Sequence, residues 1–222
     1  MNIAQAIDHT LLKPEATERQ IRTLCSEALE YQFAATCVNL CWVPLVSDLL
    51  RASQVKTCSV IGFPLGATNT KAKVYEAQQA IDQGAQEIDM VINIGWLKSN
   101  ELSKVAGDIK AVRSATSSPL VLKVIIEAAV LTDDEIQTMA KMCVDQGADF
   151  VKTSTGMHPA GGAKLEHVSL IKKMVGNRAE IKAAGGIRTH VELMKFIQAG
   201  ATRIGCSSSV QIMQEASCPK IA

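Results

Sequence analysis

The chain has 222 residues, of which 47% are hydrophobic and 20% are charged, a composition typical of a soluble globular protein. A formal net charge of +1, without a basic run interleaved with aromatic residues, argues against a nucleic-acid or membrane partner. The longest apolar stretch, residues 120–126, is interrupted by Lys123 and is too short to span a bilayer.

The cysteines and the first residues bear on the cellular compartment. The seven cysteines are odd in number, and several lie inside apolar runs, which favours reduced thiols in the cytoplasm over a disulfide framework. The start of the chain, MNIAQAIDHT, lacks the basic and apolar regions of a signal peptide. We therefore expect a cytoplasmic protein, and because the composition shows no break, we expect residues 1–222 to form a single domain.

Short β-branched runs recur along the chain and are the predicted strands. In chain order they are Ala6–Thr10, Ala35–Asn39, Lys56–Gly62, Glu87–Asn93, Leu120–Glu127, Phe150–Ser154, Glu180–Ala184 and Arg203–Cys206.

Amphipathic helical segments separate these strands. In TERQIRTLCSEALEYQ, Thr17 is the predicted N-cap. In TDDEIQTMAKMCVDQGA, Thr132 and Glu135 have the spacing of a capping box, and Gly147 ends the helix. TNTKAKVYEAQQAIDQGA and THVELMKFIQAGA follow the same pattern.

Eight strands that alternate with helices predict parallel strands joined by crossovers. Lys123, Lys152 and Lys182 are spaced by 29 and 30 residues, about the length of one strand–helix unit. This pattern favours an α/β fold of the (β/α)₈ TIM-barrel class in one domain. The alternative is an open doubly wound sheet, but no G-x-G-x-x-G sequence follows the first strand.

In a barrel, alternate strand residues point inward. If the three lysines point inward, so do the alternate positions of their strands. These are Val121, Lys123, Ile125 and Glu127 on the fifth strand, Phe150, Lys152 and Ser154 on the sixth, and Glu180, Lys182 and Ala184 on the seventh. Three ammonium groups would then meet inside the barrel, and Asp89 and Glu127 would supply negative charge nearby.

Burial and a like-charged neighbour both favour the neutral form of a lysine, which is a nucleophile that forms Schiff bases with carbonyl compounds. Asp89 could then move protons to and from the covalent intermediates, directly or through one water. A structural interpretation stays open: each lysine could extend to solvent or pair with a carboxylate, and Lys123 could be a structural cation beside Glu127 or Asp89.

A second group of residues follows the last two strands. Gly185 and Gly186 come directly after the seventh strand, and Gly205, Ser207 and Ser208 lie at the end of the eighth. TIM barrels often bind phosphate here, because glycine permits close backbone approach and a helix N-terminus favours an anion. Taken outside a barrel, the same residues would be ordinary turn and cap residues.

Several segments resemble the deoxyribose-phosphate aldolase family over nearly the whole chain. They are DHTLLKPEAT, TCVN, VIGFPLGA, EIDMVINIG, LKVIIE, FVKTSTG and AAGGIRT. The resemblance implies a class I aldolase on a TIM barrel that reversibly cleaves 2-deoxy-D-ribose 5-phosphate to acetaldehyde and D-glyceraldehyde 3-phosphate in deoxyribose phosphate catabolism. It also implies small-molecule substrates, no metal or other cofactor, and a homo-oligomer, with a dimer as the expected form.

The resemblance assigns roles to individual positions. It implies that Lys152 is the Schiff-base lysine, Lys182 the neighbouring lysine that perturbs it, and Asp89 the proton-transfer residue. Lys123 would order Asp89 and a water molecule. The substrate-binding positions would also include Thr10, Cys37 and Thr155, with Gly185, Gly186, Gly205, Ser207 and Ser208 at the phosphate.

Two departures from the family pattern affect the site. Ser209 stands where relatives commonly have glycine, so it could tighten the turn of the phosphate loop, and the tail EASCPKIA lacks the C-terminal tyrosine that some members use. The spacing of Cys37 and Cys41 and of the four histidines does not match a metal site. The remaining alternatives are another class I barrel aldolase with a different acceptor, and a non-catalytic phosphosugar-binding barrel.

Overall fold

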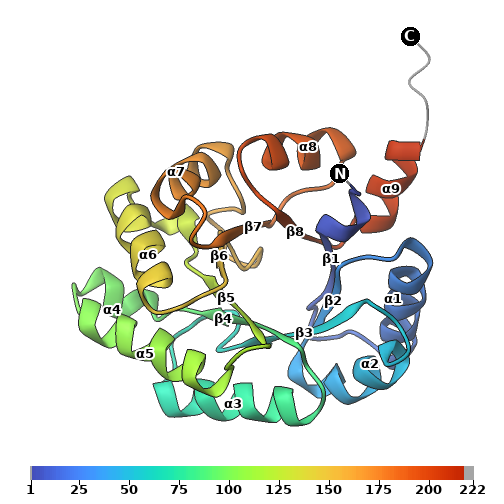
Figure 1. Ribbon diagram of the computed structural model, residues 1–222, viewed down its shortest axis with the longest axis horizontal. Coiled ribbons are helices and arrows are strands. Elements are labelled where there is room, and N and C mark those ends of the chain that lie inside the picture. The colour runs from blue at the N-terminus through green and yellow to red at the C-terminus, as the bar shows by residue number, and fades with distance from the viewer. Residues whose placement is uncertain (1, 218–222) are drawn as a thin grey trace.

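The computed structural model describes residues 2–217, which form a closed barrel of parallel strands surrounded by helices (Figure 1). The strands are β1 (Ile7–Leu11), β2 (Ala35–Val38), β3 (Lys56–Ile61), β4 (Glu87–Val91), β5 (Val121–Ile125), β6 (Phe150–Lys152), β7 (Glu180–Ala184) and β8 (Arg203–Cys206). Each strand pairs with its neighbours in sequence, and β1 pairs with β8 to close the cylinder. The predicted (β/α)₈ barrel is confirmed, and the open sheet is wrong.

The helices lie outside the ring of strands (Figure 1). They are α1 (Glu18–Tyr31), α2 (Val43–Leu50), α3 (Thr70–Asp82), α4 (Ile94–Lys98), α5 (Leu102–Ala115), α6 (Asp133–Asp145), α7 (Leu165–Val175), α8 (His190–Gln198) and α9 (Ser209–Ser217). Two of them, α4 and α5, share the connection between β4 and β5. Within residues 2–217, no helix is both long enough and apolar enough to cross a bilayer.

The predicted helix starts are set by side-chain caps. Thr17 caps α1, and Thr132 caps α6 in a capping box with Glu135, as the sequence predicts. Gln20 completes a capping box at Thr17 as well. In each, the threonine hydroxyl accepts from a backbone N–H that has no partner within the first turn of the helix. These caps fix where each helix begins and therefore how long the preceding connection is.

The two faces of the barrel wall differ in chemistry. On β5 and just after it, Leu122, Val124 and Ile126 are buried in the apolar layer between strands and helices, as expected. The opposite face carries Lys123 into the interior, where it is fully buried and ion-paired. Lys152 on β6 and Lys182 on β7 also reach this interior, which makes the centre of the barrel an ionic site.

Two of the expected inward carboxylates do not join the lysines. Glu127 has a left-handed backbone conformation, with φ at 53°, which ends the alternation of β5, and its carboxylate accepts hydrogen bonds from the backbone N–H and hydroxyl of Thr155. Glu180 is exposed at the start of β7 and accepts a hydrogen bond from Thr202. Within residues 2–217, Glu127 forms no ion pair with the three lysines, and its partner is Thr155.

Candidate active site

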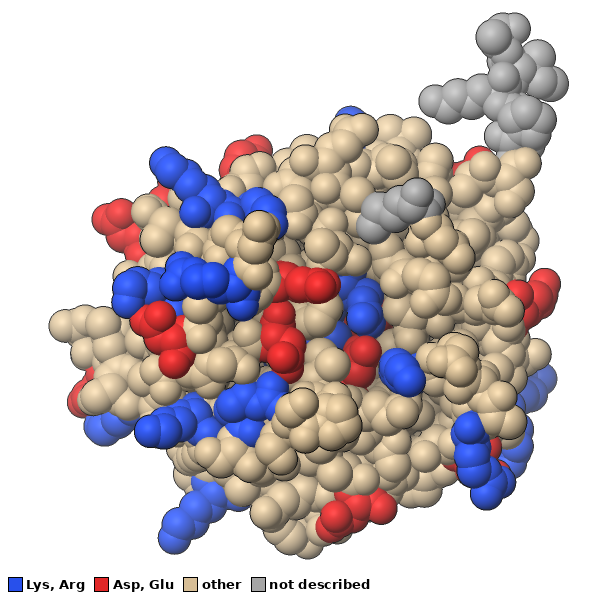
Figure 2. Space-filling model, viewed as in Figure 1, with Lys and Arg blue, Asp and Glu red and all other residues tan. Residues whose placement is uncertain are grey.

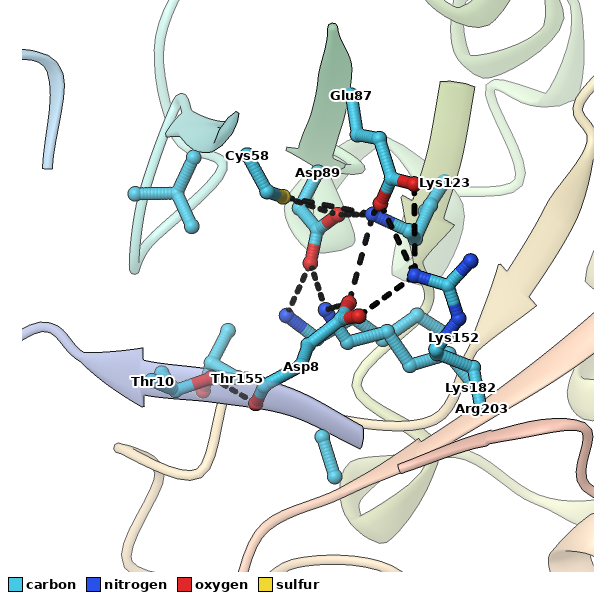
Figure 3. A network of polar contacts seen from close by, with 12 residues as sticks. Asp8, Thr10, Cys58, Glu87, Asp89, Lys123, Lys152, Thr155, Lys182 and Arg203 are labelled. Carbon is cyan, nitrogen blue, oxygen red and sulfur yellow. Dashed lines mark hydrogen bonds and ion pairs between the residues drawn. The ribbon is translucent and has the colours of Figure 1, made fainter. Parts of the chain in front are cut away.

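Asp89 is the centre of the buried ionic site (Figure 3). Its Oδ2 atom accepts hydrogen bonds from Nζ of Lys152 and Nζ of Lys182, both at 2.7 Å, and its Oδ1 atom accepts one from Nζ of Lys123 at 2.8 Å. The strand register explains the convergence, because Asp89 is the partner of Lys123 and Lys152 is the partner of Lys182. The four residues that the sequence predicts to meet are in direct contact.

Three further charged residues extend this network and were not identified from the sequence. Asp8 lies 2.5 Å from Lys182 and 2.6 Å from Arg203, and Glu87 lies 2.5 Å from Lys123. Arg203 also pairs with Glu87 at 3.2 Å. Glu87 could have been found from its position two residues before Asp89 on the same strand, which places both side chains on one face.

Burial and ion pairing oppose each other in this network. Burial alone would raise the pKa of Asp89, but the ammonium groups of Lys123, Lys152 and Lys182 hold it well below its ordinary value. For Lys182, burial would lower the pKa, and the carboxylates of Asp8 and Asp89 raise it above its ordinary value. Asp89 is therefore an ionised carboxylate and Lys182 an ammonium group.

The network contains more basic than acidic side chains. Lys123, Lys152, Lys182 and Arg203 are four basic groups against the three carboxylates of Asp8, Glu87 and Asp89. Loss of one proton from a lysine would leave the network neutral. Lys152 and Lys182 lie together as expected, but through a shared carboxylate oxygen, an arrangement that the sequence does not predict.

A pocket of about 310 Å³ opens above Lys152, which is the only one of the three lysines that lines it. Its lining includes Thr10 and Thr155 and, from the ends of β7 and β8, Gly185, Gly186, Gly205 and Ser207. All these residues lie at the C-terminal ends of strands, where TIM-barrel enzymes have their active sites. The predicted lysine site and the predicted phosphate site thus share one pocket.

Other predicted residues lie near the pocket without lining it. Asp89, Lys123 and Lys182 are sealed beneath its floor, with no exposed surface. Cys37 is also fully buried and packs in a small apolar cluster that includes Leu12. Ser208 is partly buried at the start of α9 and is not part of the lining.

Two glycines of the pocket, Gly185 and Gly205, stand where a side chain would collide with a neighbour, and the neighbour differs between them. Gly185 has a φ of +92°, and a Cβ atom there would lie 2.9 Å from the Cα of Gly162 and 3.1 Å from that of Gly156, so the loops after β6 and β7 approach closely at this point. At Gly205, a Cβ atom would lie 2.9 Å from Cε of Lys182. Gly205 therefore leaves the space in which the Lys182 side chain reaches Asp89.

Two cationic residues at the pocket were not identified from the sequence. Lys13, from the loop after β1, and Arg188, from the loop after β7, both line it. They place positive charge beside the glycines and Ser207. The sequence could have indicated both residues, because LLKPEAT and GGIRT lie directly after predicted strands, and active sites of TIM barrels form at those strand ends.

Of the two departures from the family pattern, Ser209 lies within the described residues. Ser209 is buried, and its hydroxyl donates to the carbonyl of Cys206 at 3.1 Å, so it closes the turn after β8 as expected. The tail that lacks a tyrosine includes residues 218–222, which lie outside the described residues.

Two groups of side chains have donor atoms close enough to share a metal ion: Cys37, Cys58 and Asp89, and Asp8, Cys58 and Glu87. In both groups the carboxylates already pair with lysine or arginine. A metal ion would have to displace these cations. On the visible face of the molecule, basic and acidic side chains are intermingled, and both signs meet at its centre (Figure 2).

The chain is similar to known aldolases in sequence. A model of the DeoC/LacD family aldolases matches residues 2–214. The deoxyribose-phosphate aldolase of Carboxydothermus hydrogenoformans is 54% identical over 96% of this chain and 94% of its own length. The deoxyribose-phosphate aldolase of Clostridium novyi is 50% identical, with 96% of both chains covered.

Solved structures of aldolases are similar to this chain in fold as well as in sequence. The aldolase QR15 has a TM-score of 0.92 and 42% identity, over 96% of this chain and 95% of its own. The tetrameric deoxyribose phosphate aldolase of Aeropyrum pernix has a TM-score of 0.88 and 35% identity, over 96% and 89% of the two chains. From the buried lysine network, the pocket above it and these likenesses together, we conclude that this chain belongs to the DeoC/LacD family of aldolases.

Proposed function

We propose that this chain reversibly cleaves 2-deoxy-D-ribose 5-phosphate to acetaldehyde and D-glyceraldehyde 3-phosphate, with Lys152 as the Schiff-base residue. The observation that carries the proposal is the position of Lys152. Its amine contacts the ionised carboxylate of Asp89 on one side and lines the pocket on the other. The names of the relatives at 54% and 50% identity support the choice of substrate.

The first steps form an iminium ion. Lys152, as the neutral amine, attacks the C1 aldehyde of the open-chain sugar, and the resulting carbinolamine loses its hydroxyl group as water. The Asp89 carboxylate, 2.7 Å from the Lys152 nitrogen, accepts and returns the protons of these steps, directly or through one water. Lys182 remains charged and keeps Asp89 in place.

The iminium ion is the electron sink for bond cleavage. Deprotonation of the C3 hydroxyl through Asp89 and water breaks the C2–C3 bond, and its electron pair moves into an enamine. Glyceraldehyde 3-phosphate leaves, and the enamine is then protonated at C2. Water hydrolyses the new iminium ion, which releases acetaldehyde and the free Lys152 amine.

The phosphate end of the substrate fits the other part of the pocket. Backbone N–H groups near Gly185, Gly186 and Gly205 and the hydroxyl of Ser207 are suitable donors to phosphate oxygens. Arg188 and Lys13 add positive charge there. Thr10 and Thr155, which line the same pocket, are the proposed contacts to the sugar.

Chemical trapping tests the covalent role of Lys152. The protein is incubated with acetaldehyde, reduced with borohydride, digested and mapped by mass spectrometry. We expect an ethyl group on Lys152 and none on Lys13, the other lysine of the pocket. The variant Lys152→Arg is the control and should carry no adduct in the pocket. An adduct on another lysine, or none on Lys152, would contradict the proposal.

The alternatives give different results in related assays. An aldolase with another acceptor would form the same adduct but would not prefer a phosphorylated acceptor over the same aldehyde without phosphate. A non-catalytic phosphosugar-binding barrel would bind ligand and leave no adduct. Comparing D-glyceraldehyde 3-phosphate with D-glyceraldehyde as acceptor separates the first case from the proposed function.

We further propose that the chain works in the cytoplasm as a homo-oligomer, with a dimer as the expected form. The six cysteines of the described residues are free thiols, which suits a reducing compartment. Leu65 and Tyr75 are large apolar side chains that are 73% and 63% exposed in the single chain. Light scattering coupled to size-exclusion chromatography would measure the number of subunits.

A further inference from the structure

Two cysteines lie side by side inside the barrel, next to the catalytic network. Cys37 on β2 and Cys58 on β3 are register partners, and both are fully buried. Their Sγ atoms and a carboxylate oxygen of Asp89 all lie within 4.8 Å of one another. The family resemblance points to Cys37 alone, but the structure shows a pair of thiols.

Cys58 is connected directly to the proposed catalytic residues. Its thiol donates to Oδ1 of Asp89 at 3.2 Å, and Nζ of Lys123 lies 3.4 Å from its sulfur (Figure 3). A chemical change at Cys58 therefore acts on the carboxylate that holds Lys152. Cys58 is the thiol that hydrogen-bonds to this carboxylate, whereas the sulfur of Cys37 lies within 4.8 Å of it, so the two thiols have different positions in the network.

The two thiols also differ in acidity. Contact with the Cys58 side chain lowers the pKa of Cys37, and although burial opposes this effect, the charge of Lys182 adds to it. Burial raises the pKa of Cys58 well above its ordinary value. Because the thiolate is the reactive form, Cys37 is the better nucleophile of the two.

A small reagent can approach the pair from the substrate pocket. Lys152 and Leu12 both line this pocket, and Leu12 packs in the same apolar cluster as Cys37 and Cys58. An aldehyde bound at Lys152 therefore occupies a pocket that Leu12 also lines. Hydrogen peroxide is smaller than such an aldehyde, so it can reach the same depth.

We propose that Cys37 and Cys58 form a reversible oxidation site at which a small peroxide produces a disulfide and thereby inactivates the enzyme. The loss of activity rests on the proposed aldolase function, whereas the formation of the disulfide does not. Neighbouring strands lie about 4.8 Å apart, within the range of Cα separations, about 4.4–6.8 Å, that a disulfide bridges. The register pairing of the two cysteines gives them this spacing.

The reaction takes place in two steps. The Cys37 thiolate attacks one oxygen of hydrogen peroxide, the O–O bond breaks, and the products are a Cys37 sulfenic acid and hydroxide, which takes up the proton that Cys37 lost. The sulfur of Cys58 then attacks the sulfenic sulfur, and water leaves with the Cys58 proton. In total, two thiols and one peroxide give one disulfide and two waters.

The disulfide changes the surroundings of Asp89. Cys58 loses the proton that it donates to Oδ1 of Asp89, and its sulfur turns towards Cys37 and away from Lys123. The carboxylate therefore loses one of its donors and shifts relative to Lys152. Because small displacements of catalytic groups have large effects on rate, we expect activity to fall by about tenfold or more.

The experiment follows the cross-link by mass and the activity in parallel. The full chain is treated with hydrogen peroxide, free thiols are alkylated under denaturing conditions, and peptides are mapped without reduction. We expect a Cys37–Cys58 cross-linked peptide, together with a loss of activity that dithiothreitol restores. If both cysteines are recovered as alkylated thiols, or if either is cross-linked to another cysteine, the proposal is wrong.

Two variants provide the controls. Cys41→Ala removes an exposed thiol outside the pair, so its response to peroxide should match that of the unaltered chain. Cys58→Ser cannot form the disulfide, and its activity should fall less on oxidation when compared with its own reduced form. Equal, reversible loss in Cys58→Ser would overturn the switch even if the cross-link forms. Since the cross-link is detected by mass, a failure of the aldolase reaction would leave that part of the result unaffected.

Discussion

Two sites in this protein bury lysines against carboxylates, and they differ in what surrounds them. Outside the barrel, Lys73 on α3 and Asp108 on α5 form a single pair at 2.5 Å, with no exposed surface on either side chain. Inside the barrel, Lys152 belongs to a network of four basic and three acidic side chains and lines a pocket.

The difference separates a structural role from a chemical one. Lys73 has one carboxylate partner at hydrogen-bonding distance, so its charge is balanced and it joins two helices. The interior network has one more basic than acidic group, and its Lys152 lines the pocket in which a ligand can bind. Burial of a lysine is common to both sites, whereas unbalanced charge next to a pocket is found at the interior site and suits the covalent role proposed for Lys152.

The largest effect should come from Lys152→Leu. This change removes the proposed nucleophile and the excess basic group together, so we expect the barrel to remain folded while kcat/KM falls by about 10³-fold or more. Aldehyde release and thermal unfolding measured on the same preparation would check both statements. A folded variant that keeps most of its activity would rule out the covalent role.

Lys73→Met should produce the opposite result, with a loss of stability and little change in activity per folded molecule. Removing one partner of a buried pair leaves the other charge unpaired, which costs about 3–5 kcal/mol of unfolding free energy. Urea unfolding would measure it. The double variant Lys73→Met with Asp108→Leu removes both charges and should regain much of the stability. If the double variant were as unstable as the single one, ion pairing would not explain the effect.

Acid should weaken the interior network through its carboxylates. The pKa values of Asp8 and Asp89 are lowered in the folded protein by the neighbouring lysines, after burial has opposed the effect. Their contribution to stability is therefore present above the unfolded value, about 3.9, and is lost as the pH falls below it. Unfolding free energies measured between about pH 6 and about pH 3 should decline most steeply near the acid end. A constant free energy across that interval would contradict this prediction.

The smallest predicted effect concerns the mouth of the pocket. Arg188→Ala removes a charged donor from the proposed phosphate end, so KM for the phosphorylated acceptor should rise by about tenfold. The same variant should treat D-glyceraldehyde as the unaltered enzyme does. A matching rise for both acceptors would show that Arg188 acts on the pocket as a whole and not on the phosphate.

The sequence predicts the barrel well because strand and helix signals are local. The bounds of β7 and β8 agree with the prediction, and capping threonines mark the starts of α1 and α6. The prediction for β6 extends too far, to Ser154, because Thr153 and Ser154 stay buried after the strand ends at Lys152. These two residues are buried but are not part of the strand, and the amino-acid type alone does not distinguish a buried strand residue from a buried loop residue.

The site is predicted less completely, since it depends on contacts between distant strands. The spacing of the three lysines correctly indicates that they meet inside the barrel near Asp89, but not that they share its carboxylate oxygens. It does not reveal Asp8 or Arg203, which come from the first and last strands and meet only when the barrel closes. It also misplaces Glu127, because the left-handed backbone at that residue turns the carboxylate towards Thr155.

The contact between Asp8 and Arg203 has a consequence for synthesis on the ribosome. These residues lie 195 positions apart, so the nascent polypeptide carries Asp8 from the outset but gains its arginine partner only when translation is almost finished. A chain released before β8 lacks both the closing strand and this cation, so β1 would keep an unpaired edge and Asp8 would lose its arginine partner.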